Sequence, residues 1–211
     1  MKQPRMKVRW AKRQVVVIHG GESFRTYAAY RAFLARLAPD FSRYRAPRRG
    51  WKGLLGWRLG ARFEVIRPDM PNKLNAKYAE WKLWFEKFIP HFAREAMFVG
   101  HSLGGLFLAK YFSENRYPKK IRAVLLVAAP WNDGDFRLAR AGGLARFARQ
   151  AGRIVLYQSK DDRVVRFADF EKYLRALPDA TSRVFRDRGH FNQEAFPELV
   201  KDIRAAARAA A

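Results

Sequence analysis

Residues 97–106 of this chain read MFVGHSLGGL. An apolar run leads into a G-x-S-x-G pentapeptide, and an amphipathic segment, 105–114, follows it. This order is typical of a nucleophile elbow, a sharp strand-to-helix turn that holds a serine in a strained backbone conformation. Such a turn needs very small residues two positions before and after the serine, and Gly100 and Gly104 supply them around Ser102. The bare pentapeptide arises by chance in roughly a few per cent of chains of this length, so the flanking pattern is what favours an elbow over a glycine-rich loop.

Length and composition predict a single folded domain, residues 1–211. Hydrophobic residues make up 49% of the chain and aromatic residues 15%, which favours a packed core over disorder. The longest apolar runs, 123–130 and 15–18, are far shorter than the ~20 residues of a membrane span. No apolar segment of signal-peptide length follows the charged first residues, so we expect a cytoplasmic protein without a membrane span. The chain has no cysteine, which excludes disulfides, thiol catalysis and cysteine-based metal sites.

The formal net charge of +24 is unevenly distributed. Residues 1–60 contain 15 lysines and arginines but only two acidic residues. Within them, segment 42–60, SRYRAPRRGWKGLLGWRLG, mixes arginine with tryptophan and leucine, and its glycine and proline content predicts an inserted loop or short helical turns. Such a segment could contact nucleic acid, anionic lipid or an acidic protein. A solvated basic surface is favoured, because no recognised nucleic-acid-binding motif accompanies the charge, and it predicts only nonspecific, low-salt binding to polyanions.

Strand and helix patterns alternate along the whole chain. Besides the strand that ends at the serine turn, strands are expected at 14–18, 62–67, 121–128, 153–158 and 182–186. Helices are expected at 24–37, 75–89, 105–114, 138–150, 167–177 and from 191 onward. The connections are too long for hairpins, which indicates parallel strands joined by right-handed crossovers. We therefore predict a doubly wound α/β fold with about six mostly parallel strands, helices on both faces and a minimal cap or none.

Polar residues that follow the predicted strands converge on one edge of such a sheet, where binding sites form. They include, in chain order, Ser102, the pair Asp161-Asp162, and His190. A serine hydroxyl is a weak nucleophile until a base removes its proton, and an imidazole can take and return that proton near neutral pH. A carboxylate fixes the tautomer of the imidazole. The oxyanion that forms needs N–H donors, and Leu103 and Gly21 are the candidates.

Several short motifs together carry a family resemblance. They are HGG at 19–21, MPN at 70–72 followed by Tyr78 and Trp81, FVGHSLGG at 98–105, SKDDRVV at 159–165 and GHFNQ at 189–193. With these motifs the chain resembles the α/β-hydrolase superfamily, and more narrowly the small, lidless serine hydrolases of the retinoblastoma-binding protein 9 family. The resemblance covers almost the whole chain, from Val15 to about Arg204. Two departures are Arg163, where related sequences often have proline, and the basic segment 42–60.

The resemblance implies a role for each residue of the motifs. It implies that Ser102 is the nucleophile, that His190 is the general base, and that the acid belongs to the Asp161-Asp162 pair. The position of this acid two residues before a valine favours Asp162, and Asp161 is then expected to hydrogen-bond within the loop. The two other histidines near the motifs, His19 and His101, are expected to pack or to bond the backbone.

Three further residues are candidates for substrate binding. Glu22 follows the HGG turn, where its carboxylate would either touch substrate or face solvent. Trp131 and Phe191 would either line an acyl pocket or cover the edge of the sheet. The chain has no H-E-x-x-H motif, carboxylate cluster or glycine-rich phosphate loop, so we expect no metal and no cofactor.

These observations predict a cofactor-free serine hydrolase that cleaves small carboxylic esters through an acyl-enzyme, with lactones as a second class of substrate. The short connection at 129–152 leaves little chain for a lid and favours short acyl groups. The alternative is a non-catalytic or dual-role binding module, in which the basic segment 42–60 contacts an acidic protein or nucleic acid. The resemblance allows it, because relatives are known as binding partners as well as hydrolases.

Overall fold

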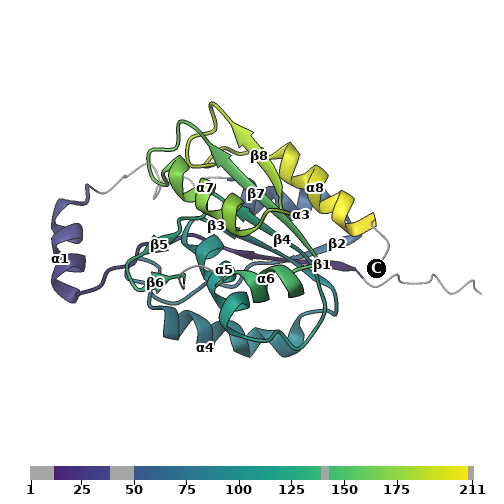
Figure 1. Cartoon of the computed structure of the whole chain (residues 1–211), viewed down its shortest axis with the longest axis horizontal. Coiled ribbons are helices and arrows are strands. Elements are labelled where there is room, and N and C mark those ends of the chain that lie inside the picture. Colours follow the sequence, from purple (N-terminus) through teal and green to yellow (C-terminus); the bar gives the residue numbers. More distant parts are fainter. Residues whose placement is uncertain (1–11, 39–49, 139–142, 209–211) are drawn as a thin grey trace, which may run out of the picture.

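A six-stranded, entirely parallel sheet forms the centre of the molecule (Figure 1). The computed structural model describes residues 12–38, 50–138 and 143–208. In spatial order the strands are β2 (Phe63–Ile66), β1 (Arg13–Ile18), β3 (Ala96–His101), β4 (Ile121–Val127), β7 (Arg153–Ser159) and β8 (Thr181–Phe185). The predicted α/β fold with about six mostly parallel strands is confirmed.

Helices cover both faces of the sheet, as a doubly wound fold requires. On one face lie α4 (Tyr78–Phe88), which continues into the short 3-10 turn η1 (Ile89–His91), α5 (Leu103–Glu114), α6 (Ala145–Gln150) and α7 (Phe167–Ala176). On the other face lie α3 (Trp51–Leu59) and α8 (Pro197–Arg208). A further helix, α1 (Tyr27–Arg36), has no buried residue and projects from one side of the molecule (Figure 1).

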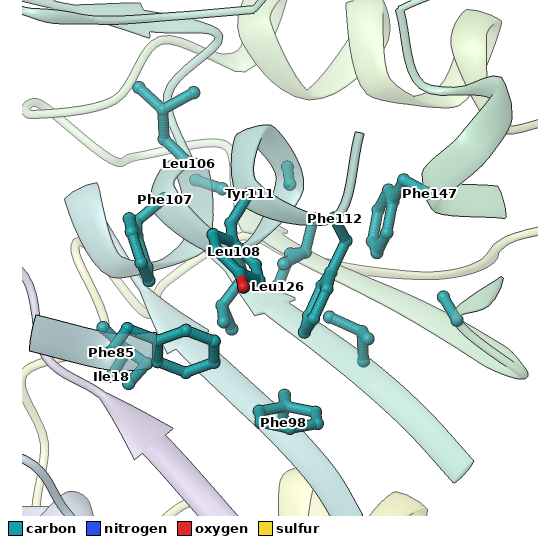
Figure 2. Packing of buried hydrophobic residues seen from close by; sticks show 14 of the residues in the cluster. Ile18, Phe85, Phe98, Leu106, Phe107, Leu108, Tyr111, Phe112, Leu126 and Phe147 are labelled. Carbon is teal, nitrogen blue, oxygen red and sulfur yellow. The ribbon is translucent and has the colours of Figure 1, made fainter. Parts of the chain in front are cut away.

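The core beneath α5 is rich in aromatic side chains (Figure 2). The rings of Phe85 and Phe107 lie 5.3 Å apart, and those of Phe98 and Phe112 lie 5.2 Å apart, both edge to face. Such pairs contribute about 0.5–1.5 kcal/mol beyond the area that they bury. Nine of the 12 residues of α5 are buried, so packing on the sheet fixes the position of this helix. The serine turn is therefore attached to a helix whose position is fixed by close packing on the sheet.

The order of the strands brings two distant turns together. The chain passes from β1 outward to the edge strand β2 and returns on the other side of β1 as β3. Ligand sites of open α/β sheets form at such a reversal, beyond the carboxyl ends of the two strands. The turn after β1, residues 19–22, and the turn after β3, at Ser102, consequently share one edge of the sheet.

For the basic segment 42–60 the prediction of a loop or short helical turns is wrong over residues 51–59. These residues form the nine-residue helix α3. Trp51, Leu55 and Leu59 are at most 4% exposed and form one helical face against the sheet and α8. Gly53 and Gly56 lower the helix propensity of the segment, but burial of three large side chains outweighs that cost. This part of the segment is an integral layer of the fold. Residues 42–49 lie outside the described residues.

The connection between β4 and β7 also differs in detail from the prediction. It contains an unpredicted two-stranded hairpin, β5 (Asn132–Asp133) and β6 (Phe136–Arg137). Of the helix expected at 138–150, α6 covers Ala145–Gln150, and residues 139–142 lie outside the described residues. Phe136 and Phe147 are fully buried, so both pieces pack on the core. This arrangement agrees with the predicted minimal cap.

The last helix begins later than predicted, at Pro197 and not at Phe191. Phe191 has a φ of 52°, which is incompatible with a right-handed helix. Proline at the first helical position has a suitable φ and lacks only an N–H that would have no partner there. Among the described residues, none of the helices has the length and apolarity needed to cross a bilayer.

The integral role of α3 can be tested with two truncations in the same helix. Leu55 is 1% exposed, and Leu55→Ala should lower the free energy of unfolding by about 2–5 kcal/mol because it leaves a cavity. Trp57 is 78% exposed, and Trp57→Ala should change it by at most about 0.5 kcal/mol. Urea denaturation measures both values. Similar values for the two variants would contradict the packing of α3 in the core.

Candidate active site

Ser102 lies in a strained turn between β3 and α5. Its φ of 55° and ψ of −126° are unfavourable for a residue with a side chain. A Cβ atom on Gly100 would lie 2.5 Å from the carbonyl oxygen of Gly104, and one on Gly104 would lie 2.4 Å from the carbonyl oxygen of Ile18. No other residue fits at either position without displacing backbone. The two glycines that the sequence analysis singled out are therefore required by close contact between backbones.

The turn after β1 lies directly against the serine turn. A Cβ atom on Gly20 would be 2.9 Å from the Cβ atom of Ser102, and one on Gly21 would be 3.5 Å from the Leu103 side chain. Leu103 is the first residue of α5, where a backbone N–H has no carbonyl partner within the helix. The two N–H groups predicted to bind an oxyanion thus belong to adjacent segments beside Ser102.

His19 holds the turn after β1 in place. Its Nδ1 atom lies 2.7 Å from the carbonyl oxygen of Gly20, and its Nε2 atom accepts a hydrogen bond of 2.8 Å from the backbone N–H of Met70. Burial lowers the pKa of His19, although the bond to Gly20 opposes this shift. A neutral ring with the proton on Nδ1 satisfies both contacts. His19 is a structural residue of the turn, as the sequence predicted.

His190 and Asp162 form a hydrogen-bonded pair on the loops after β8 and β7. The distance from Nδ1 of His190 to Oδ2 of Asp162 is 2.9 Å, and the Asp162 side chain is fully buried. The other carboxylate oxygen accepts hydrogen bonds from the backbone N–H groups of Val164 and Val165, at 2.8 and 3.0 Å. Desolvation alone would raise the pKa of Asp162, but the bonds from His190 and the two N–H groups outweigh it and lower this pKa. Asp162 is therefore ionised at neutral pH and can orient the imidazole.

Asp161 has a different position and braces the loop that carries His190. Its Oδ1 atom accepts hydrogen bonds from the hydroxyl of Ser159, at 2.5 Å, and from the backbone N–H of Gly189, at 2.9 Å. The Ser159 hydroxyl in turn accepts from the backbone N–H of Arg188, at 3.0 Å. Asp162, and not Asp161, is therefore the acid that contacts the imidazole of His190. This is the assignment of the two acids that the sequence favoured.

His101 connects the serine turn to the His190 loop. Its Nε2 atom lies 2.9 Å from the carbonyl oxygen of His190, and the two imidazole rings are 4.8 Å apart. His101 is only 4% exposed, and this burial, with the nearby Lys52 and His190, lowers its pKa well below the usual value. His101 is therefore neutral, and its contact keeps the neighbouring Ser102 close to the His190 loop.

Two carboxyl groups lie near this edge, one of which the sequence analysis missed. Desolvation raises the pKa of Glu22, and the proximity of His190 opposes the shift. Burial and the charge of Glu22 raise the pKa of Asp133 to about 6. Asp133 lies two residues beyond Trp131, in the connection after β4, so the convergence of strand ends could have identified it.

The two aromatic candidates have different positions. Trp131 is partly buried and packs edge to face on Tyr173, with ring centroids 5.1 Å apart. Phe191 is fully buried in the core under α3 and α8 and stacks on Phe196 at 5.2 Å. Phe191 therefore does not line an acyl pocket, and the prediction of a substrate contact is wrong. Phe191 directly follows His190 in the chain, and its buried ring anchors the loop that carries His190 in the core.

No group of three or more histidine, aspartate and glutamate side chains within residues 12–38, 50–138 and 143–208 converges in a way that could hold a metal ion. The residues gathered at this edge are a hydroxyl, an imidazole bonded to a carboxylate, and free N–H groups. These are the groups that acyl transfer uses.

Comparisons with known proteins agree with this arrangement. A rat protein named serine hydrolase RBBP9 is 25% identical over 165 residues, which are 74% of this chain and 86% of that protein. The ydeN gene product from B. subtilis has a similar fold, with a TM-score of 0.69 at 17% identity over 94% of this chain and 100% of the other. A serine hydrolase involved in carbazole degradation, the CarC enzyme, has a TM-score of 0.61 at 15% identity over 92% and 90% of the two chains.

The decisive comparison is with the family described as serine hydrolase, which residues 44–199 match. This range includes the elbow at Ser102, the acidic pair and His190. It covers well over half of the chain, and the fold and the site described above are consistent with it. The protein belongs to the serine hydrolase family and has the α/β-hydrolase fold.

Proposed function

We propose that this serine hydrolase cleaves small carboxylic esters through an acyl-enzyme, with Ser102 as nucleophile, His190 as general base and Asp162 as the acid that orients His190. The observation that carries the proposal is the 2.9 Å hydrogen bond between His190 and the buried, ionised Asp162, beside the strained Ser102 turn. Lactones are a second class of substrate, because opening a cyclic ester requires the same attack on a carbonyl carbon.

The reaction takes place in two halves. Ser102 Oγ attacks the carbonyl carbon while His190 takes the hydroxyl proton, and the N–H groups of Leu103 and Gly21 stabilise the oxyanion. His190 then returns the proton to the departing alcohol, which leaves the acyl group on Ser102. Water, activated by His190, attacks this acyl-enzyme and releases the carboxylic acid and the free serine.

Two residues are proposed to contact the substrate beside the scissile bond. Glu22 directly follows the Gly21 turn, and its carboxylate lies close enough to His190 for the two groups to interact electrostatically. Trp131 follows β4 and presents a partly buried ring at the same edge of the sheet. The packed connection after β4, which includes the buried Phe136 and Phe147, offers little cover for a long acyl chain.

Within residues 12–38, 50–138 and 143–208, no contact specifically favours the rival interpretation as a binding module. Of the two tryptophans in the basic segment 42–60, Trp51 is 2% exposed and belongs to the core, whereas Trp57 is 78% exposed. Arg43, Arg45, Arg48 and Arg49 lie outside the described residues. Nonspecific binding to polyanions at low salt remains a prediction from the net charge of +24.

Removal of the nucleophile tests the proposal directly. Ser102→Ala should lower kcat on a p-nitrophenyl short-chain ester by roughly four or more orders of magnitude, because no acyl-enzyme can form. The wild-type protein should react with a fluorophosphonate probe, the variant should not, and circular dichroism should show that both are folded. A variant that retains a tenth of the activity would refute Ser102 as nucleophile.

The two neighbouring acids provide a matched comparison. Asp162→Asn should reduce kcat by about 10⁴, because the amide no longer selects the imidazole tautomer that accepts the serine proton. Asp161→Asn should retain most activity, because its amide oxygen can still accept the bonds from Ser159 and Gly189. The same esterase assay measures both, and the reverse ranking would assign the orienting acid to Asp161.

The length of the acyl chain tests the openness of the site. Each methylene contributes about 0.8 kcal/mol to binding only where the protein covers it. Hydrolysis of p-nitrophenyl esters should therefore be fastest for acyl chains of about two to six carbons and should decline for longer ones. A steady rise in kcat/KM up to about twelve carbons would show a hydrophobic cover over the site and would contradict the proposed substrate class.

A further inference from the structure

Helix α1 stands apart from the core of the molecule. In the part of the chain that the structure describes, none of its ten residues is buried, and Figure 1 shows the helix projecting from one side. Its first turn is capped by the side chain of Thr26, which accepts a hydrogen bond of 3.1 Å from the backbone N–H of Ala29. The helix is therefore formed by local interactions, and the proposed chemistry makes no use of it.

The large side chains of α1 and of the residue after it lie on one side of the helix. They recur at intervals of three or four residues, which places them on the same side: Tyr27, Tyr30, Phe33, Leu34 and Leu37. Phe24 lies at the base of this row, with its ring 5.7 Å from that of Tyr30 and 5.1 Å from that of Phe33. Tyr27 is 69% exposed, Leu34 40% and Leu37 47%. An apolar face is therefore presented to the surroundings of the molecule.

The charge around this apolar face is positive. Residues 23–39 of the sequence contain three arginines, Arg25, Arg31 and Arg36, and no acidic residue. Beside the helix lies a groove of about 510 Å³, which is lined by Tyr30 and by residues of segment 72–80 that include two lysines, an exposed leucine and one acidic residue: Lys73, Lys77, Leu74 and Glu80. The carboxylate of Glu80 accepts a hydrogen bond of 2.9 Å from the side chain of Asn72. The face is thus bordered mainly by cations.

An anionic lipid bilayer is the partner whose chemistry matches this combination. Its interface takes up leucine and tyrosine side chains, while its phosphates attract arginine and lysine. A second copy of this chain fits less well, because each copy carries a net charge of +24 and the two would repel each other. Nucleic acid would neutralise the arginines but would leave Leu34 and Leu37 against phosphate and water.

The base of α1 lies beside the proposed active site. The backbone N–H of Glu22 donates to the carbonyl oxygen of Lys73, and the carbonyl oxygen of Glu22 accepts from the backbone N–H of Ala76, both at 2.8 Å. Two residues further on, the carbonyl oxygen of Phe24 accepts a hydrogen bond of 2.5 Å from Nζ of Lys77. Segment 73–77 therefore holds both the turn after β1 and the start of α1, and a surface that binds α1 comes close to the turn beside Ser102.

We propose that α1 is an interfacial anchor, whose apolar face of Tyr27, Leu34 and Leu37 enters the headgroup region of an anionic lipid bilayer while the neighbouring arginines bind the lipid phosphates. The helix lies in the plane of the membrane surface and does not cross the bilayer. Docking brings the turn after β1 to the membrane surface. The inference goes beyond the proposed function, because the association needs no hydrolysis.

Sedimentation with vesicles provides the first test. At physiological ionic strength the wild-type protein should bind vesicles of phosphatidylcholine and phosphatidylglycerol in equal parts, and should not bind vesicles of phosphatidylcholine alone. Leu34→Ser combined with Leu37→Ser should lower the partition coefficient at least about tenfold, because the apolar contribution to binding is lost. Circular dichroism should show that the variant is folded.

The matched control is Leu83→Ser, which removes an exposed leucine of α4 and should bind the vesicles as the wild type does. Nonspecific attraction by the net charge of +24 is the same in all three proteins, so a difference between them reports the face of α1. Equal binding of the wild type and the Leu34→Ser, Leu37→Ser variant would reduce the association to nonspecific attraction and would overturn the proposal.

A fluorescent label provides a second test. The chain has no cysteine, so Leu34→Cys carries an environment-sensitive nitrobenzoxadiazole label at one defined position, and Ala32→Cys carries it on the opposite side of α1. With the mixed vesicles, the emission of the label at position 34 should shift to the blue and gain intensity, while the label at position 32 should emit as in water. An equal response at the two positions, or none, would contradict insertion of the apolar face. A blue-shifted label at position 34 without vesicles would show that protein covers this face, which would also refute the proposal.

Both tests are independent of hydrolysis. Ser102→Ala should bind the mixed vesicles as the wild type does, because Ser102 takes no part in the association. A wild-type protein that neither hydrolyses esters nor reacts with fluorophosphonate would refute the esterase assignment and leave the membrane anchor standing. Failure of the vesicle tests in an active enzyme would refute the anchor alone.

Discussion

The close approach of three backbone segments around Ser102 is the constraint on which the rest of the structure depends. Gly100 lies against Gly104, and Gly104 lies against the carbonyl oxygens of Ile18 and His19 at the end of β1. A non-glycine residue with a φ of 55° costs on the order of 1–3 kcal/mol, and the surrounding packing maintains it. Because β3 and α5 are almost wholly buried, the turn between them cannot relax without disrupting the core.

This constraint also determines what can lie beside the serine. The parallel pairing of β1 with β3 places the turn after β1 against Ser102. His19 fixes the conformation of that turn by its hydrogen bonds to the backbone. The N-terminus of α5 then offers its free N–H groups and the positive end of its dipole at the same point. Positive electrostatic potential beside Ser102 therefore follows from the strand order and from one helix terminus.

The His190 loop is held by a different kind of interaction, a network of hydrogen bonds from several elements. Asp162 bonds its imidazole, Asp161 bonds the neighbouring Gly189, and Trp51 bonds the carbonyl oxygen of Phe191. The fully buried ring of Phe191 anchors the loop in the core below. These contacts restrict the imidazole to a narrow range of orientations, as the proposed role of His190 as general base requires.

The sequence by itself determined the alternation of strands and helices, the elbow and the two acids that follow β7. These features are local, because a glycine spacing or a β-branched run has the same steric consequence in any parallel sheet.

The sequence did not determine the structure of residues 51–59 or the environment of Phe191. The glycines of residues 51–59 favoured a loop, and the position of Phe191 after His190 allowed either a pocket wall or a cover over the edge of the sheet. Burial in the core beside α8 instead made residues 51–59 a core helix and Phe191 a core side chain. Only the tertiary structure decided this, because burial depends on residues such as Phe196 that are distant in the sequence, and its free energy exceeds local conformational preference. The same reason applies to Lys52, which belongs to the basic segment that the sequence favoured as a solvated surface and whose ammonium group lies 3.3 Å from Nδ1 of His101.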